Sequence, residues 1–506
     1  MKSLIKTSAL AIGLAVALGA TAAEAQFRVM LPINPGVALT AGAPETPVDP
    51  QEPEQESLND WSLLASDLPE GTSRAEYSFD FSTLITTDPV DYALADLSWS
   101  VDSLPDWLEI DPATGALSGT PPTYGETSFT VSADHAEEGS RQQGYTVTIN
   151  GVPLEATQVS VRNSVACAIT TEGAAMCWGA GGNGMLGNGS TSNTTVPTLV
   201  SGLESGVTDI EVGNQHVCAV HNGAAKCWGR GTNGMLGNGG TTDSNVPVQV
   251  TGLTSGVTMI RSGSGNSCAI HNGAAKCWGK GTNGILGNGS TANSNIPVQV
   301  TGLTSQVTSI AAGSYIACAV HNGAAKCWGS NNNGMLGNGS TTNSTVPVQV
   351  TGLNSGVTMV SAGGSSGHSC AVHNGAAKCW GLNSSGNLGN GSTTGSNVPV
   401  QVTGLQSNIT SISAGNSGAC ALVSNSRARC WGFGGSGQLG NGGTANSSTY
   451  VQVSGLTSGV TSISAGSNTA CAVHNGTAKC WGSASNGVRG DGLTSGNIPT
   501  PVQVIH

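Results

Sequence analysis

Fourteen cysteines are the residues of this chain whose type and spacing suggest chemistry most directly, and they form seven pairs. The members of a pair are nine or ten residues apart, the second is followed at once by Trp-Gly, and successive pairs begin 50 to 52 residues apart. Zinc sites use C-x₂₋₄-C spacing and two converging pairs, so this pattern favours disulfides over a metal. We predict one bridge within each pair: Cys167 with Cys177, Cys218 with Cys227, Cys268 with Cys277, Cys318 with Cys327, Cys370 with Cys379, Cys420 with Cys430, and Cys471 with Cys480.

The residues between the two cysteines predict how they meet. Between Cys218 and Cys227, the dipeptide Asn222-Gly223 is the strongest short-range signal for a two-residue type I′ hairpin turn. Counting outward from this turn places the two cysteines opposite each other, at a ladder position where Cα atoms are about 4.5 Å apart. In the two pairs with spacing ten, three-residue turns at 171–173 and 424–426 keep the same pairing.

The rest of each unit predicts two further strands. An alternating segment such as 307–313 precedes the hairpin, and a segment such as 346–350 follows it after a long Gly/Asn loop. Proline at the head of the last strand, as at Pro347, fits an edge position because proline donates no ladder hydrogen bond. Seven repeats of four short strands predict an all-β fold, a seven-bladed β-propeller with one disulfide per blade.

The N-terminal third differs in composition and divides into three segments. Residues 1–25 carry Lys2, Lys6, an apolar run and Ala-Glu-Ala, which is the pattern of a cleaved secretory signal peptide. Residues 26–57 read as a flexible acidic Pro-rich linker, and the alternating runs of 58–151 predict a small immunoglobulin-like β-sandwich before the propeller at 152–506. Export would supply the oxidising compartment that disulfides need. We therefore predict a secreted bacterial protein, extracellular or periplasmic, without membrane insertion.

The repeat unit also matches a known pattern. Ala-Gly-(x)₄-Cys-Ala-Val-(x)₆-Cys-Trp-Gly, followed by Asn-Gly-Met-Leu-Gly-Asn-Gly and Val-Pro-Val-Gln-Val, resembles the regulator of chromosome condensation repeat family over residues 152–506. The resemblance implies a seven-bladed propeller, often closed by strands from opposite chain ends. Residues 104–121 resemble the immunoglobulin-like, cadherin-like modules of bacterial surface proteins, which act as spacers or adhesive units. Family members include a nuclear nucleotide-exchange factor, a secreted β-lactamase inhibitor and binding scaffolds, so the resemblance leaves function open.

Three positions depart from the repeat, and all lie in the last two units or the first. Arg489 stands where the other units have the Leu of Gly-x-Leu-Gly-x-Gly, Tyr450 replaces the strand proline, and Arg162 occupies a glycine position. The atypical units are thus at the two ends of the repeat region, where we expect the ring of blades to close.

Composition argues against several classes of function. The propeller holds seven carboxylates that do not recur as acid and base pairs, and it lacks a nucleophile elbow, so we predict neither an enzyme nor a cofactor. Its 12 basic side chains form no stripe, which argues against nucleic acid. The 22 acidic residues of positions 1–150 are best explained as solvating charge. Five histidines before the Asn-Gly turns would lie too far apart for one metal, and we predict no metal site.

Differences between otherwise similar units fall just before the first cysteine and just after Trp-Gly. Both loops should emerge on the same face of the propeller, so the differences would gather into one ring. Either drift in exposed loops or a binding face explains them. The binding hypothesis selects the large or charged members: His216, Arg230, Lys280, Tyr315, His368 and Phe433.

Two further side-chain roles follow from strand geometry. The Trp of each Cys-Trp-Gly neighbours a cysteine and faces the other side of its strand, so we expect it to pack between blades rather than to stack on a ligand. Glu211 and Arg261 stand at equivalent positions on the innermost strands of adjacent blades, within reach of a salt bridge near the channel.

These observations favour a secreted binding or adhesion scaffold, monomeric, whose partner is an extracellular or cell-surface protein or glycan. An inhibitor of an extracellular hydrolase is the alternative. Tight interfaces use Trp, Tyr and Arg anchors, and beyond the packing Trp this propeller offers only Tyr315, Phe433 and Tyr450 as aromatics. That scarcity weakens the inhibitor interpretation.

The hairpin pairing gives the first prediction. Peptide mapping of the native protein under non-reducing conditions should join Cys218 to Cys227, and likewise within each other pair, because the turn brings only those partners together. A bridge between cysteines of different repeats would contradict the pairing.

Overall fold

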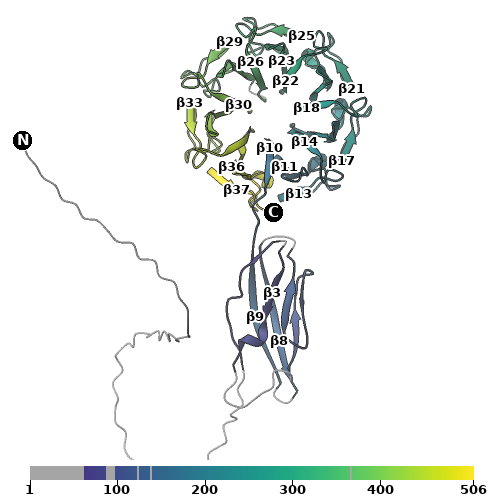
Figure 1. The fold of residues 1–506 in the computed structure, drawn as a ribbon, viewed down its shortest axis with the longest axis vertical. Helices are drawn as coiled ribbons and strands as arrows, with labels where there is room; N and C mark the ends of the chain where they lie inside the picture. The colour runs from purple at the N-terminus through teal and green to yellow at the C-terminus, as the bar shows by residue number, and fades with distance from the viewer. Residues whose placement is uncertain (1–61, 74, 87–96, 122–124, 137–138, 365–366) are drawn as a thin grey trace, which may run out of the picture. The chain divides into compact units, whose positions relative to one another are not determined.

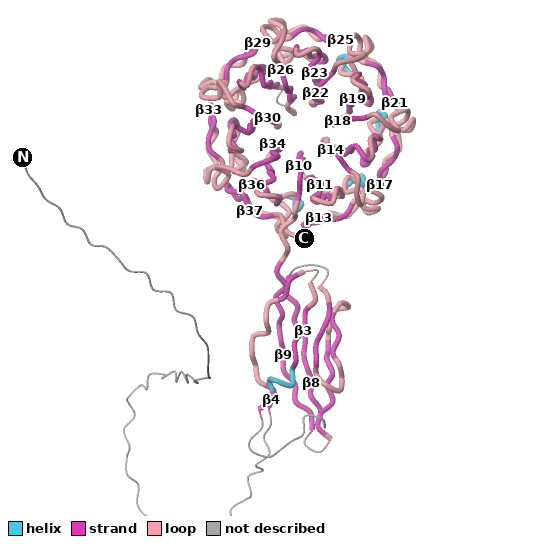
Figure 2. Tube along the Cα trace, viewed as in Figure 1, coloured by secondary structure: helices cyan, strands magenta, loops and turns pink. Residues whose placement is uncertain are grey.

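The computed structural model describes residues 62–73, 75–86, 97–121, 125–136, 139–364 and 367–506 (Figure 1). The predicted signal peptide (1–25) and linker (26–57) lie outside these residues. The rest is strand, turn and short 3-10 helix, as the tube in Figure 2 shows. The protein is therefore all-β over its described part.

The N-terminal sandwich is built from two main sheets. One has the order β2-β9-β8-β5, and the other β3-β7-β6. Phe81, Leu117, Val131 and Val147 are fully buried between them, which confirms the expected immunoglobulin-like core. The elements are β1 (Ser62–Leu63), β2 (Gly71–Thr72), β3 (Tyr77–Asp80), η1 (Phe81–Leu84), β4 (Ile85–Thr86), β5 (Leu97–Asp102), β6 (Leu108–Ile110), β7 (Ala116–Gly119), β8 (Gly125–His135) and β9 (Gly139–Asn150).

Seven four-stranded antiparallel sheets follow among the described residues, each made of consecutive strands. Blade 1 is β10 (Ala156–Arg162), β11 (Val165–Thr170), β12 (Ala175–Gly179) and β13 (Thr194–Leu199); blade 2 is β14 (Val207–Val212), β15 (His216–His221), β16 (Ala224–Gly229) and β17 (Ser244–Gln249); blade 3 is β18 (Val257–Ser262), β19 (Asn266–His271), β20 (Ala274–Gly279) and β21 (Ser294–Gln299); blade 4 is β22 (Val307–Ala312), β23 (Ile316–His321), β24 (Ala324–Gly329) and β25 (Ser344–Gln349). Blade 5 is β26 (Val357–Ala362), β27 (His368–His373), β28 (Ala376–Gly381) and β29 (Ser396–Gln401); blade 6 is β30 (Ile409–Ala414), β31 (Gly418–Val423), β32 (Arg427–Gly432) and β33 (Ser447–Gln452); blade 7 is β34 (Val460–Ala465), β35 (Thr469–His474), β36 (Thr477–Ser483) and β37 (Asn497–Gln503). Within the described blades, single 3-10 turns stand before the last strand at η3 (Gly182–Gly184), η4 (Thr232–Gly234), η5 (Thr282–Gly284) and η6 (Ser485–Gly487).

The seven sheets form a propeller around a central channel, as predicted. The first strand of each blade lines the centre and the fourth lies at the rim (Figure 1). The rim strand pairs on one side only, which confirms the edge position that its proline indicated. The strand begins earlier than expected, however: β25 starts at Ser344, so Pro347 lies inside it rather than at its head.

The hairpin register is the predicted one. Asn222 and Gly223 have φ of 50° and 77°, as a type I′ turn requires, and Cys218 lies opposite Cys227. The Cα atoms of each bridged pair lie 4.0–4.1 Å apart, slightly closer than the expected distance.

All seven disulfides form within their pairs, as predicted, and no cysteine of the chain is free. The three-residue turns of blades 1 and 6 keep the two cysteines opposite each other, just as the two-residue turns do in the other blades. The bridges join Cys167 to Cys177, Cys218 to Cys227, Cys268 to Cys277, Cys318 to Cys327, Cys370 to Cys379, Cys420 to Cys430, and Cys471 to Cys480.

Each tryptophan packs between blades, again as predicted. Trp228 is fully buried, and its indole N–H donates to the carbonyl of Met185 in the preceding blade at 3.0 Å. Gly187 lies over the ring, where an added Cβ would come within 2.8 Å of the indole nitrogen. The hydrogen bond recurs in every blade, at Trp178–Val488, Trp278–Met235, Trp328–Ile285, Trp380–Met335, Trp431–Asn387 and Trp481–Gln438.

The ring closes in the connector between blades and not inside a blade, which differs from the closure that the family resemblance implied. In blade 2 the N–H of Ala225 donates to the carbonyl of Leu253 in the connector to blade 3. At the closure, Ala478 N–H donates in the same way to Leu154, and Leu154 N–H donates to Val504. Residues 152–154 and 504–506, from the two ends of the repeat region, thus rebuild one connector, which we call the seam.

The atypical Arg489 lies in the last blade beside the seam. It is fully buried, and its Nε donates to Asp491 at 2.6 Å while Nη1 donates to the carbonyls of Gly482 and Gly496. Asp491 stands where other units have Asn, as at Asn188. The exchange of Leu for a buried Arg is therefore matched by a half-buried counter-charge.

The glycine above each tryptophan gives the second prediction. Gly237→Ala should destabilise the propeller by about 2–5 kcal/mol, because φ is +67° and the new Cβ would lie 2.7 Å from Trp278 Nε1. The matched control is Gly252→Ala, which has φ of +72° but nothing within 4 Å, and should lose about 1–2 kcal/mol. Denaturant unfolding followed by tryptophan fluorescence measures both. Equal losses would show that the contact with tryptophan is unimportant.

Candidate functional site

One backbone hydrogen bond in each blade brings the two variable loops together. In blade 2 the N–H of Arg230, directly after Trp-Gly, donates to the carbonyl of Gln215, three residues before Cys218. The same bond joins the equivalent residues elsewhere: Ala180 to Ser164, Lys280 to Gly265, Ser330 to Tyr315, Leu382 to Gly367, Phe433 to Ser417 and Ser483 to Asn468. These fourteen positions define what we call the loop face. The expected ring of variable residues therefore exists as a geometric feature.

Two of the selected residues do not belong to this surface. His216 and His368 are fully buried, and each begins a strand instead of ending a loop. His216 Nε2 lies 2.6 Å from Ser267 Oγ in the next blade, and the ring of His368 packs beneath Gly363. Because side chains alternate along a strand, these histidines share the interblade side of their cysteines. The structure therefore contradicts their predicted place on the exposed loop ring.

Three other selected residues meet around one groove of about 210 Å³ across blades 2, 3 and 4. Arg230 is half-buried, Lys280 is exposed, and Tyr315 is 46% exposed. Arg230 Nη1 donates to Gln215 Oε1 at 2.9 Å, which fixes its position at the groove wall. The remaining lining is mainly amide, hydroxyl and glycine: Thr232, Asn233, Ser264, Gly265, Asn266, Thr282, Asn283 and Ser314. We call this the cationic groove.

Phe433 lies apart from the cationic groove. It is half-buried against Gly435 and borders a separate cavity of about 20 Å³ between blades 6 and 7. Leu382 in blade 5 is also half-buried. The loop face is therefore uneven, with cations on blades 2 and 3 and larger apolar side chains on blades 5 and 6.

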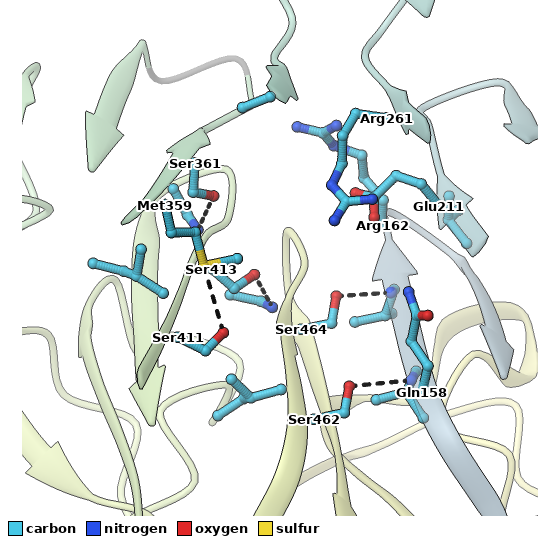
Figure 3. A pocket seen from close by; sticks show the side chains of 18 of the residues that line it. Gln158, Arg162, Glu211, Arg261, Met359, Ser361, Ser411, Ser413, Ser462 and Ser464 are labelled. Carbon is cyan, nitrogen blue, oxygen red and sulfur yellow. Dashed lines mark hydrogen bonds between the residues drawn. The ribbon is translucent and has the colours of Figure 1, made fainter. Parts of the chain in front are cut away.

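The central channel is a second cavity, of about 280 Å³, and its charges lie on blades 1 to 3 (Figure 3). Arg261 donates to Asp209 at 2.8 Å, and this carboxylate also accepts from Gln158 Nε2 and from the N–H of Ile260. Arg162 reaches past blade 2 to donate to the carbonyl of Ser262 in blade 3 at 2.9 Å. The charged residues thus tie three inner strands together.

Serines of the inner strands satisfy the edges of neighbouring inner strands, and those of blades 5 to 7 line the wall of the channel opposite the charges. Ser462 and Ser464 of blade 7 accept hydrogen bonds from the N–H groups of Val159 and Val161 in blade 1, at 3.3 and 3.0 Å (Figure 3). Ser160, Ser361 and Ser413 do the same for the next blade around the ring. The inner strands would otherwise expose unpaired edges.

The expected ion pair involves a different carboxylate. Glu211 and Arg261 both line the channel, but the ion pair that Arg261 makes is with Asp209, two residues before Glu211. Residues two apart on a strand share a face, so sequence alone could not choose between the two carboxylates. Burial raises the pKa of Glu211, and Arg261 opposes this shift. Asp209 is the channel residue that sequence reasoning missed, although it is the only charged residue at a position where the other blades have Gln, Ser or Met.

Within the described residues, no three or more His, Cys, Asp or Glu side chains gather where a metal ion could be held. No helix of this part has the length and apolar character needed to cross a membrane. The groove and the channel thus offer hydrogen bonds and charge, but no assembled metal centre.

Sequence comparison identifies both parts of the chain. A family model described as "Regulator of chromosome condensation (RCC1) repeat" matches residues 172–220, 222–270, 272–320, 322–372, 374–422 and 430–473, and a second with the same description matches 409–438. A "Putative Ig domain" model matches residues 61–150.

Solved structures agree with the propeller fold. Human WBSCR16 is 18% identical, with a TM-score of 0.55 over 66% of this chain and 90% of that one. Yeast RCC1 (Prp20), solved bound to Kap60, is 20% identical, with a TM-score of 0.58 over 70% and 85%. Prp20p from Saccharomyces cerevisiae is 19% identical, with a TM-score of 0.56 over 70% and 88%. At these identities the likeness concerns the fold alone.

The buried histidines give the third prediction. Burial lowers the pKa of His216, helped by Arg162, and that of His368, each to about 4. In the unfolded chain the two histidines have the ordinary pKa of about 6.5. Between about pH 6.5 and pH 4 the unfolded chain therefore binds protons that the folded protein does not bind. The free energy of unfolding should fall over this range by up to about 3 kcal/mol for each histidine.

Urea unfolding across this pH range tests the effect. The variant His216→Asn with His368→Asn carries at both sites the residue that blade 3 has at its equivalent position, Asn266, and it should lose less stability on acidification. An unchanged pH dependence would mean that the two imidazoles are not responsible.

Proposed function

Because this chain belongs to the regulator of chromosome condensation repeat family, whose propeller it carries behind an immunoglobulin-like module, we propose that it is a binding scaffold that works outside the cytoplasm. The loop face would be its partner surface, and the partner an extracellular or cell-surface protein or glycan. The repeats alone do not fix this role, since the family's fold serves several functions.

The observation that carries the proposal is the gathering of variable residues at one groove. The seven units are alike in their hairpins and tryptophans, yet the backbone bond after Trp-Gly places their differing residues on one face. Arg230, Lys280 and Tyr315, from three different blades, then border the same groove. Arginine and tyrosine are, with tryptophan, the residue types enriched among those that carry most binding energy at interfaces.

The extracellular setting rests on two features. Seven disulfides occupy all fourteen cysteines, and such bonds persist in oxidising compartments. The first 25 residues have the composition of a secretory signal peptide. We accordingly propose that the protein works in the periplasm or outside the cell.

Affinity capture with the purified protein tests the partner surface. Culture supernatant and cell-envelope fractions of the producing organism should yield a retained partner. The double variant Tyr315→Ala with Phe433→Ala should retain at least ten-fold less of it, because both side chains lie on the loop face. Thermal stability should change little, since Tyr315 is exposed and Phe433 is half-buried outside the hairpins.

The matched control alters the turn ends of two hairpins, in blades 3 and 4, on the side opposite to the loop face. His271 and His321 precede the Asn-Gly turns, away from the loop face, so His271→Ala with His321→Ala should bind like the unmodified protein. Loss of capture in this control, with full capture by the loop-face variant, would place the partner surface elsewhere.

A further inference from the structure

The cationic groove carries positive charge that the protein does not itself neutralise. Among the described residues that line it, none is Asp or Glu. Arg230 makes its side-chain hydrogen bond to the neutral Gln215, and within the described part Lys280 forms no ion pair. Asp243 lies in the loop of blade 2 but does not line the groove, and it accepts the N–H of Gly231. The groove is therefore suited to a ligand with negative charge.

The rest of the lining matches the hydroxyl groups of a sugar better than the side chains of a protein. Amides and hydroxyls can both donate and accept, as sugar hydroxyls require. Of these residues, Asn233 and Thr282 are exposed, and Ser264 and Asn283 are half-buried, so their polar groups can meet a ligand. Tyr315 is 46% exposed and adds a flat apolar surface with a polar tip.

A peptide would find little to hold it in this groove. Strand addition needs an open sheet edge, but the groove is bordered by loops, and the open edges belong to the rim strands β17, β21 and β25. An anchoring side chain needs an apolar pocket, and the apolar residues here, Met235 and Ile285, are 1% and 3% exposed within the blade packing.

We propose that the cationic groove binds a carboxylated oligosaccharide: Arg230 and Lys280 pair with its carboxylates, Tyr315 lies against a sugar ring, and the amide and hydroxyl lining holds sugar hydroxyls. This inference rests on the proposed function, since it names the ligand class of the same face. The groove crosses three blades, so the ligand is a chain of sugars and not a single one.

The test is direct binding of the full protein to a panel of oligouronates and sialylated oligosaccharides. Each is paired with its carboxyl-reduced, uncharged counterpart, and hexaglutamate serves as an acidic peptide of similar charge. At least one carboxylated oligosaccharide should bind, with at least ten-fold preference over both its reduced form and hexaglutamate. Affinity should fall as salt increases, because exposed ion pairs are screened.

Variants assign the binding to the groove. Arg230→Gln with Lys280→Gln, and separately Tyr315→Ala, should each weaken binding at least ten-fold, while Tyr315→Phe keeps most of it. The control Lys326→Gln removes one positive charge close to the hairpin turn of blade 4, away from the loop face, and should bind normally. Unchanged thermal unfolding shows that each variant is folded.

The outcomes separate this inference from the proposed function. If no carboxylated oligosaccharide binds, or if reduced sugars or hexaglutamate bind as well, the inference is wrong. The same holds if the groove variants bind normally. If the loop face still captures an envelope partner in that case, the scaffold role stands without it. If neither a carboxylated oligosaccharide nor an envelope partner binds to the loop face, the proposed scaffold role is wrong as well.

Discussion

The hydrogen bond from each buried tryptophan to the preceding blade is the interaction on which the propeller depends. A four-stranded sheet of these small residues cannot bury both faces alone, so each blade is stable only against its neighbours. Trp228 fills the space between blades and fixes its indole N–H to Met185, and Gly187 leaves room for the ring. The bond from Trp178 to Val488 carries the same contact across the seam, so the first and last blades pack like any other pair.

Much of this architecture could be predicted because the same turn, cysteine pair and Trp-Gly recur in seven units of the sequence. Asn222-Gly223 fixes a two-residue turn, the turn fixes the register, and the register fixes the disulfide and the face on which Trp228 lies. Each inference depends only on local rules of the strand, which tertiary structure does not override here. The seam was harder to predict. Leu154 accepts the hydrogen bond that Leu253 accepts in the connector after blade 2, but the sequence around Leu154 is not that of a full connector.

The placement of the candidate residues could be predicted only in part, and the errors share a physical cause. His216 lies two residues before Cys218, where a shift of the strand boundary by one residue decides between an exposed loop and a buried strand. Arg261 forms its ion pair with Asp209 and not with Glu211. Both carboxylates lie on one face of the same strand, so only the three-dimensional distance to Arg261 distinguishes them. Arg230 and Tyr315 do lie in loops, as the sequence indicated, because they stand just outside the strands, which end at Gly229 and begin at Ile316.

The seam also has a mechanical consequence. Strand β9 of the immunoglobulin-like module ends at Asn150, and the seam begins two residues later with the paired N–H and carbonyl groups of Val152 and His506. If the N-terminal part were anchored while a ligand pulled on the loop face, tension in the chain would reach these hydrogen bonds before it reached any disulfide-closed hairpin. The ring would yield first at its closure, and the disulfides would keep each hairpin joined while the blades separate.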